Sequence, residues 1–193
     1  MPVDSFKYLP RAIATYYRMT AAKSELPIPW TPVPRPPSQC TFGLVTSGGL
    51  YHMGVERPFD VEQEKQEPER GDPSYRTLPT DVQPSELGAS HLHINTRDVV
   101  EDINILLPIH RFQELAAEGR VGGLAKHAYS LMGHQGFPPN TTAWQEIYGP
   151  EAARKLAAEA VTCVLLTRPD LTAPQTRPCW HGRSKQLACP RSW

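Results

Sequence analysis

The sequence has no excess of charge of either sign: 20 lysine and arginine residues balance 20 aspartate and glutamate residues among 193. A balanced charge gives no long-range field that would favour nucleic acid or an anionic membrane. No apolar run approaches the length of a membrane-spanning helix, and the N-terminus lacks the apolar region of a signal peptide. We therefore expect a cytoplasmic protein with no nucleic-acid partner and no membrane partner.

Cysteines are few, and their positions, 40, 163, 179 and 189, show neither a disulfide framework nor paired metal-ligand spacing. Cys163 lies within the apolar run 160–166, so we expect an inert thiol in the core. The sequence gives no evident sign of a cofactor.

Proline, in contrast, is abundant: of 21 prolines, 14 are crowded into residues 27–37, 68–84 and 169–190. Such segments form long extended connections. We expect three regions. Residues 1–37 form an amphipathic helix after Pro10 and a proline-rich strap anchored by Trp30, residues 38–167 form an α/β domain that is incomplete, and residues 168–193 form an irregular tail.

Short apolar runs bounded by glycine or proline alternate with helical patterns along the middle of the chain. The strands that these runs predict are 42–45, 91–95, 103–107, a segment ending at 133–135, and 161–166. Helices are predicted at 109–119 and from Gly149 onward, and a long surface loop between Gly54 and Pro84. This order predicts an α/β fold, with an open parallel or mixed sheet, helices on both faces and long proline-rich loops.

The turn behind the first predicted strand combines two hydroxyl side chains with two glycines, Thr46, Ser47, Gly48 and Gly49. Glycines that adopt positive φ leave backbone N–H groups exposed, and ligands of open α/β sheets bind outside the carboxyl ends of strands. These four residues are therefore candidates for binding an anion or a carboxylate. The alternative is an ordinary strand-to-loop turn.

His134 and Gln135 stand at another predicted strand end. His134 is the leading candidate for acid–base chemistry or substrate binding, because imidazole titrates near neutral pH; the alternative is a hydrogen-bonded structural histidine. His91 and His93 are two residues apart and would share one face of a strand. Such a pair can chelate a metal, but no third ligand is visible, so we favour a structural role and expect no metal site. We expect His134 to meet the 46–49 turn in one pocket, with His91 or His93 nearby.

Seven segments resemble, in order, the motifs of a known enzyme family: Gly43–Tyr51, Pro58–Asp60, Gly71–Arg76, Ser90–His93, Asp102–Pro108, His127–Gln135 and Ala160–Thr167. The chain resembles, over about residues 5–167, the selenoprotein B group of glycine, sarcosine, betaine and D-proline reductases and its cysteine-bearing relatives. The resemblance implies reductive cleavage of a carbon–nitrogen bond in a small amino acid or amine, with electrons from a dithiol. It also implies other reductase subunits as partners, one of which carries a pyruvoyl group in some members. Tyr75, within one of these motifs, joins the candidate substrate-binding residues.

The chain departs from the family pattern after Thr167, where residues 168–174 replace the loop that carries the nucleophilic cysteine or selenocysteine. We therefore expect impaired reductase activity. The alternatives are a non-redox α/β protein that binds a small carboxylate, a racemase-like enzyme, or a structural partner subunit.

The tail from 168 to 193 shows neither helical nor strand periodicity, and we expect it to be poorly ordered. Codons that would encode this tail can also be read in a shifted frame. From Cys179 onward, permitted codon choices then encode an amphipathic helix closed by glycine and proline. Extended upstream to Asp170, the same frame permits Pro-Asp-Cys-Pro. The hypothesis is that the tail results from a frameshift and that the native protein is longer.

Overall fold

The computed structural model describes residues 10–12, 14–15, 32–33, 35–67, 69–136 and 140–169. The chain divides into two compact units, Met1–Trp30 and Thr31–Trp193. In the first unit, residues 11, 12, 14 and 15 are helical, and the N–H of Ala14 donates to the carbonyl of Pro10 at 2.9 Å. The rest of the predicted N-terminal helix, most of the strap with Trp30, and the tail from residue 170 lie outside the described residues.

The second unit is built on a mixed five-stranded sheet: β1 (Thr41–Thr46), β3 (Tyr75–Pro79), β5 (Gly123–Leu124), β6 (His127–Leu131) and β7 (Cys163–Thr167). β1 is central and pairs in parallel with β5 and β6 over successive stretches and with β7 along most of its length. β3 pairs antiparallel with β6. A separate antiparallel pair consists of β2 (Leu50–His52) and β4 (Leu87–Ala89).

The helices are α2 (Val61–Gln66), α3 (Thr96–Glu101), α4 (Ile109–Ala117) and α5 (Gly149–Ala158). Three 3-10 turns, η2 (Pro37–Gln39), η3 (Pro84–Glu86) and η4 (Ile103–Ile105), and a π-helical segment, η5 (Trp144–Tyr148), complete the described elements.

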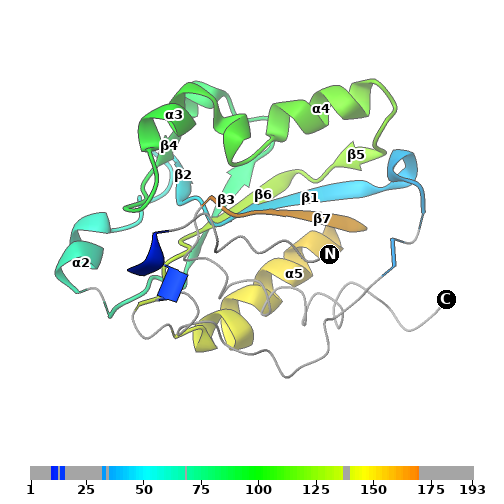
Figure 1. The fold of residues 1–193 in the computed structure, drawn as a ribbon. Helices are drawn as coiled ribbons and strands as arrows, with labels where there is room; N and C mark the ends of the chain where they lie inside the picture. Colours follow the sequence, from blue (N-terminus) through cyan, green and yellow to red (C-terminus); the bar gives the residue numbers. More distant parts are fainter. Residues whose placement is uncertain are drawn as a thin grey trace. The chain divides into compact units, whose positions relative to one another are not determined.

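Side chains on alternate positions of β1 enter two separate cores, because successive residues of a strand point to opposite faces. Leu44 packs with Val99, Ile109 and other residues of α3, η4 and α4. Val45 packs with Leu156 and other residues of α5 and its surroundings. Helices therefore cover both faces of the sheet, with α3 and α4 on one side and α5 on the other (Figure 1), and the predicted α/β fold with a mixed sheet is confirmed.

The strands expected at 42–45 and 161–166 and the helices expected at 109–119 and from Gly149 correspond to β1, β7, α4 and α5. The strand expected at 103–107 is wrong, because this apolar run begins with the 3-10 turn η4. Asp102 explains the difference: its Oδ1 accepts the N–H of Asn104 at 3.0 Å, which caps a helical turn rather than a strand.

The strand expected at 91–95 is also wrong, because the segment forms turns. The N–H of His93 donates to Nδ1 of His91 at 3.1 Å, and Oδ1 of Asn95 accepts the N–H of Arg97 at 3.2 Å at the start of α3. In a strand, these backbone N–H groups would bond to a neighbouring strand. Here they bond to nearby side chains instead, which favours a turn.

The long loop expected between Gly54 and Pro84 contains α2 and β3. Asp60 caps α2, since its Oδ1 accepts the N–H of Gln63 at 2.9 Å. β3 ends at Pro79 and pairs only with β6 among the described strands, and an edge position is where a sheet tolerates proline. Among the described residues, no helix has both the length and the apolar character needed to cross a membrane.

Candidate functional site

The carboxyl ends of β1, β6 and β7 meet at one edge of the sheet. Thr46 lies beside Ser130 of β6 and beside Thr167 of β7. The loops that leave these strands therefore emerge together, which is where ligands of such sheets bind.

The turn after β1 is buried and hydrogen-bonded within the protein. Its N–H groups donate to three acceptors: Ser47 to the carbonyl of Thr167 (3.1 Å), Gly48 to Oγ1 of Thr46 (3.2 Å) and Gly49 to the carbonyl of Leu131 (3.1 Å). The expectation that these N–H groups are exposed is wrong. Ser47 Oγ is buried and, among the described residues, has no hydrogen-bond partner, so a ligand-binding role for the turn stays a prediction.

Gly49 brings the turn against the loop that carries two of the candidate histidines. Its φ is +66°, and a Cβ at this position would lie 2.3 Å from the carbonyl oxygen of Ser90. The N–H of Ser90 in turn donates to the carbonyl of Gly49 at 2.9 Å. Only glycine allows this close backbone contact without a shift, and it places His91 next to the turn.

The structure brings the three candidate histidines together from two separate loops. The rings of His91 and His93 are 6.0 Å apart between centroids, and those of His93 and His134 are 5.5 Å apart. His91 is buried, His93 is exposed and His134 is half-buried. His134 follows β6 and therefore stands at the carboxyl edge, as its position in the sequence predicts.

Glu64, a residue of α2, lies within hydrogen-bonding distance of this histidine group. Its Oε1 is 3.1 Å from Nε2 of His93, and its side chain is only 9% exposed. Ligand atoms from Glu64, His93 and His134 all lie within 4.8 Å of one another. The sequence did not indicate Glu64, because it belongs to a charged stretch that we interpreted as a surface loop.

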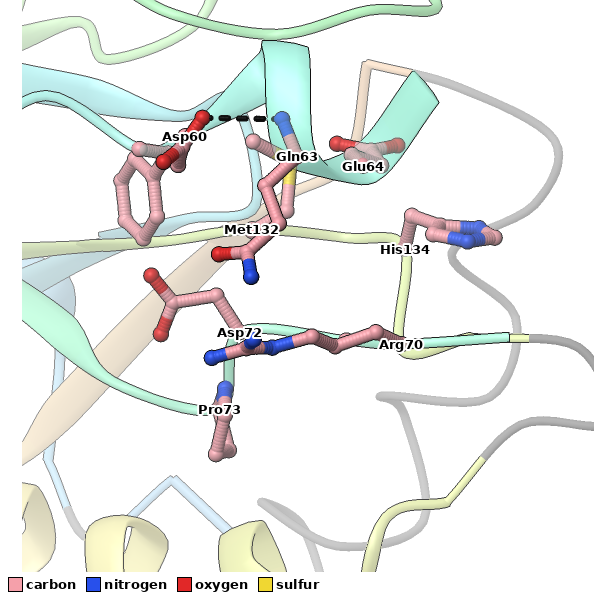
Figure 2. A pocket seen from close by; sticks show the side chains of 10 residues that line it. Asp60, Gln63, Glu64, Arg70, Asp72, Pro73, Met132 and His134 are labelled. Atoms are coloured by element: carbon pink, nitrogen blue, oxygen red, sulfur yellow. Dashed lines mark hydrogen bonds between the residues drawn. The ribbon is translucent and has the colours of Figure 1, made fainter. Parts of the chain in front are cut away.

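A pocket of about 180 Å³ opens beside these residues. Asp60, Glu64, Arg70, Asp72 and His134 supply its charged or titratable side chains. Figure 2 shows Arg70 and Asp72 on the side of the pocket opposite α2. Met132 lies between α2 and these two residues. The pocket therefore combines three carboxylates with one guanidinium and one imidazole.

A network on the wall of the pocket fixes the carboxylate of Asp72. Its Oδ1 accepts the N–H of Ser74 at 2.9 Å, and its Oδ2 is 3.6 Å from the guanidinium of Arg76. The same guanidinium lies 4.0 Å from the ring centroid of Phe59, another lining residue. Asp72 is thus held in place before any ligand binds, which lowers the entropic cost of binding.

Gln135 braces the loop that carries His134. Its buried Nε2 lies 2.7 Å from the carbonyl oxygen of Asp72, 3.0 Å from that of Met132 and 2.9 Å from that of His134. The two N–H donors of this amide are therefore already shared among three main-chain oxygens, so the side chain supports the loop that carries His134.

Tyr75 packs in the core on the α5 side of the sheet. Its hydroxyl donates to Oε1 of Glu151 at 2.7 Å, and Nζ of Lys155 lies 5.0 Å from its ring centroid. Burial raises the pKa of Tyr75, and burial raises that of neighbouring Tyr129 to about 12. Both hydroxyls are therefore protonated at neutral pH, and the described contacts of Tyr75 do not include the histidine group.

The two described cysteines lie at the other end of the strands. Cys40 precedes β1, and Cys163, which begins β7, pairs with Phe42 near the start of β1. Burial raises the pKa of Cys163, and nearby Cys40 raises it further. At about 3.3 Å per residue, Cys163 is roughly 13 Å from Thr167 at the carboxyl edge. Neither described thiol is positioned to react in the pocket, and Cys179 and Cys189 lie outside the described residues.

The fold and the site define a mixed α/β protein with a small charged pocket at the carboxyl edge of its sheet. Over 138 residues the chain is 36% identical to D-proline reductase subunit gamma of Acetoanaerobium sticklandii. The match covers 72% of this chain and 52% of that subunit, so the chain is related to a reductase subunit and spans about half its length. No family model matches the chain, and no solved structure matches it.

Proposed function

We propose that the chain is a subunit of a reductase of the selenoprotein B type, which cleaves a carbon–nitrogen bond in a small amino acid or amine. The observation that carries this proposal is the 36% identity to D-proline reductase subunit gamma. The pocket beside His134 is the proposed substrate site, because it is concave and lies where the loops of the parallel strands converge.

The charges of the pocket suit a small zwitterion. Arg70 offers a planar guanidinium, which binds a carboxylate through two parallel hydrogen bonds. Asp60 and Asp72 offer carboxylates to an ammonium group. A volume of about 180 Å³ suits a molecule of the size of D-proline.

The proposed reaction consumes two thiols for each bond that is broken. The carbon–nitrogen bond breaks, the carbon and the nitrogen each gain a hydrogen, and the dithiol that supplies two electrons and two protons becomes a disulfide. His134 is the proposed donor of the proton to the departing nitrogen, because imidazole exchanges protons near neutral pH.

The described residues provide no nucleophile beside the pocket. The resemblance implies a cysteine or selenocysteine just beyond the last strand, and β7 does end at the carboxyl edge beside Ser47. Arg168 and Pro169 follow it, and no thiol occupies the described part of that loop. We therefore propose that the chain as written binds substrate but turns it over little, and that partner subunits complete the enzyme.

A second candidate function is binding of a small carboxylate without redox chemistry. It is favoured by the position of Cys40 and Cys163, which lie at the opposite end of the sheet from the pocket. On this hypothesis Arg70 provides the main contact, and the amine of the ligand contributes little.

Isothermal titration calorimetry of the full chain tests both candidates. We expect D-proline to bind, and we expect at least about tenfold weaker binding by Arg70→Ala, since a bond to a charged group contributes about 1.5–3 kcal/mol. Arg111→Ala is the matched control, because Arg111 is exposed on α4 and pairs with Glu114 at 2.8 Å. The second probe is tetrahydrofuran-2-carboxylate, in which an oxygen replaces the amine.

Equal binding of the two probes would favour the carboxylate-binding candidate over the reductase. Binding of D-proline that is unchanged in Arg70→Ala would reject the pocket as the site. No binding of D-proline, glycine, sarcosine or betaine would reject the proposed substrate class.

A further inference from the structure

We propose that Glu64, His93 and His134 form a binding site for a divalent transition-metal ion, with Zn²⁺ as the best match. The site goes beyond the proposed reductase function, and its evidence is the arrangement of three side chains. A metal-bound His134 cannot also donate the proton to the departing nitrogen, so metal binding and that role of His134 are alternatives. Glu64 comes from α2, His93 from the loop before α3, and His134 from the loop after β6.

The distances fit a metal centre after small side-chain movements. A tetrahedral zinc ion with bonds of about 2.0–2.1 Å separates its ligand atoms by about 3.3 Å. Oε1 of Glu64 and Nε2 of His93 are already 3.1 Å apart. The largest separation within the three ligand atoms is no more than 4.8 Å, so rotation of the partly exposed His134 ring closes the set.

The chemistry of the donor set is specific. Two imidazoles with one carboxylate are the protein ligands of a recurring class of catalytic zinc sites, and the same set with open positions also binds Fe²⁺. An ion pair between Glu64 and His93 alone would explain their 3.1 Å contact. The proposed metal site differs from this ion pair in including His134, whose ligand atom lies within 4.8 Å of the same two ligand atoms.

Surrounding contacts hold the segment of each ligand. Asp60 caps α2 through the N–H of Gln63, which immediately precedes Glu64. Nδ1 of His91 accepts the N–H of His93 at 3.1 Å. Gln135 binds the carbonyl oxygen of His134 at 2.9 Å. A metal site is more precise when its ligands are fixed in this way by supporting hydrogen bonds.

Two of the three proposed ligands line the pocket. Glu64 and His134 both line it, and Figure 2 shows the two side chains at the same end. Three protein ligands leave at least one coordination position open for a further ligand. A carboxylate or an amine in the pocket would complete the coordination of the metal.

Metal titration of the tag-free full chain tests the site without reference to catalysis. We expect one equivalent of Zn²⁺ to bind, with a dissociation constant at least about tenfold higher in Glu64→Gln, His93→Ala and His134→Ala. His52→Ala is the matched control, because His52 lies in β2 outside the cluster. Glu64→Gln keeps the shape of the side chain, and far-ultraviolet circular dichroism checks that each variant is folded.

Cobalt(II) absorption identifies the ligands. We expect the visible bands of a nitrogen and oxygen site, without the strong near-ultraviolet charge-transfer band of a cobalt–thiolate bond. Zinc affinity unchanged in all three variants, a thiolate band, or no stoichiometric binding would each overturn the proposal. Because zinc binding and D-proline binding are measured separately, failure of one hypothesis leaves the other testable.

Discussion

The side-chain nitrogen of Gln135 lies 2.7 Å from the main-chain oxygen of Asp72, and this contact joins the loop after β6 to the segment before β3. The backbones meet at the same place, because Gly71 and Gln135 form an isolated antiparallel bridge. A Cβ on Gly71 would lie 2.4 Å from Cα of Gln135, so a glycine is needed for this approach. Asp72 and His134, which line the same pocket, depend on this contact for their spacing.

The first prediction concerns Gln135→Ala. The change leaves three main-chain oxygens without this donor, and we expect the free energy of unfolding to fall by about 1–3 kcal/mol. Urea denaturation measures the loss. Gln145→Ala is the control, since the exposed Gln145 side chain donates to Oγ1 of Thr141, and its effect should stay within about 0.5 kcal/mol. Equal losses in the two variants would contradict the bracing role.

The second prediction concerns pH and Glu159. Burial alone would raise the pKa of Glu159, but hydrogen bonds from the His127 side chain and from the N–H groups of Lys126 and His127 outweigh it, so that the pKa lies below its ordinary value of 4.5. A lowered carboxyl pKa stabilises the fold fully above 4.5, and the stabilisation is lost as the pH falls through the folded pKa.

We therefore expect Glu159→Gln to lower the free energy of unfolding by about 1–3 kcal/mol at neutral pH. The difference from the unmodified chain should shrink as the pH falls below 4.5, measured by urea denaturation across a pH series. Glu118→Gln, on an exposed residue 3.7 Å from Arg120, should change little at any pH. A stability difference that grows toward low pH would show that the predicted direction of the pH dependence is wrong.

The third prediction is that the chain as written has little or no dithiol-dependent reductase activity on glycine, betaine or D-proline. The reason is that the loop which would carry the nucleophile after Thr167 is absent from the sequence, and the two described thiols lie at the amino ends of the strands. Consumption of D-proline with dithiothreitol measures it, and Cys163→Ala should leave the background rate unchanged. Turnover that Cys163→Ala abolishes, but that Cys179→Ala does not, would show that Cys163 is the nucleophile.

The fourth prediction concerns the DNA that encodes residues 160–193. We expect a shifted reading frame there to continue beyond Thr167 with Pro-Asp-Cys-Pro and an amphipathic helix. Sequencing of genomic DNA checks this directly. A stop codon in the shifted frame, or a frame without such a helix, would end the hypothesis.

The sequence alone was enough to predict the helices and strands that have strong local signals. α4 has apolar residues on one face, and Gly119 follows its end with a φ of +70°, so its boundaries follow from periodicity and capping. The run at 103–107 has no such periodicity, and there the side chain of Asp102 decided the conformation. β3 was missed because its only described partner, β6, lies more than 45 residues away in the chain, and local chemistry does not encode that pairing.

The pocket shows the same difference between residues with a local sequence signal and residues brought in by long-range packing. His134 was identified because it follows an apolar run, and strand ends at this edge tend to carry function. Glu64 and Arg70 were not identified, since charged residues in a polar segment look alike whether they face solvent or a pocket. Their proximity to His134 arises from the packing of α2 against loops that are distant in sequence.

The central position of β1 has a consequence for how the chain folds as it is made. Phe42 pairs with Cys163, so one edge of β1 stays open until some 120 further residues have left the ribosome. At about 5–20 residues per second this takes on the order of ten seconds, and pairings at such long range also form slowly. An apolar strand with an unpaired edge can form hydrogen bonds with strands of other chains, which leads to aggregation. We therefore expect the nascent chain to require chaperone binding at β1 until β7 is synthesised.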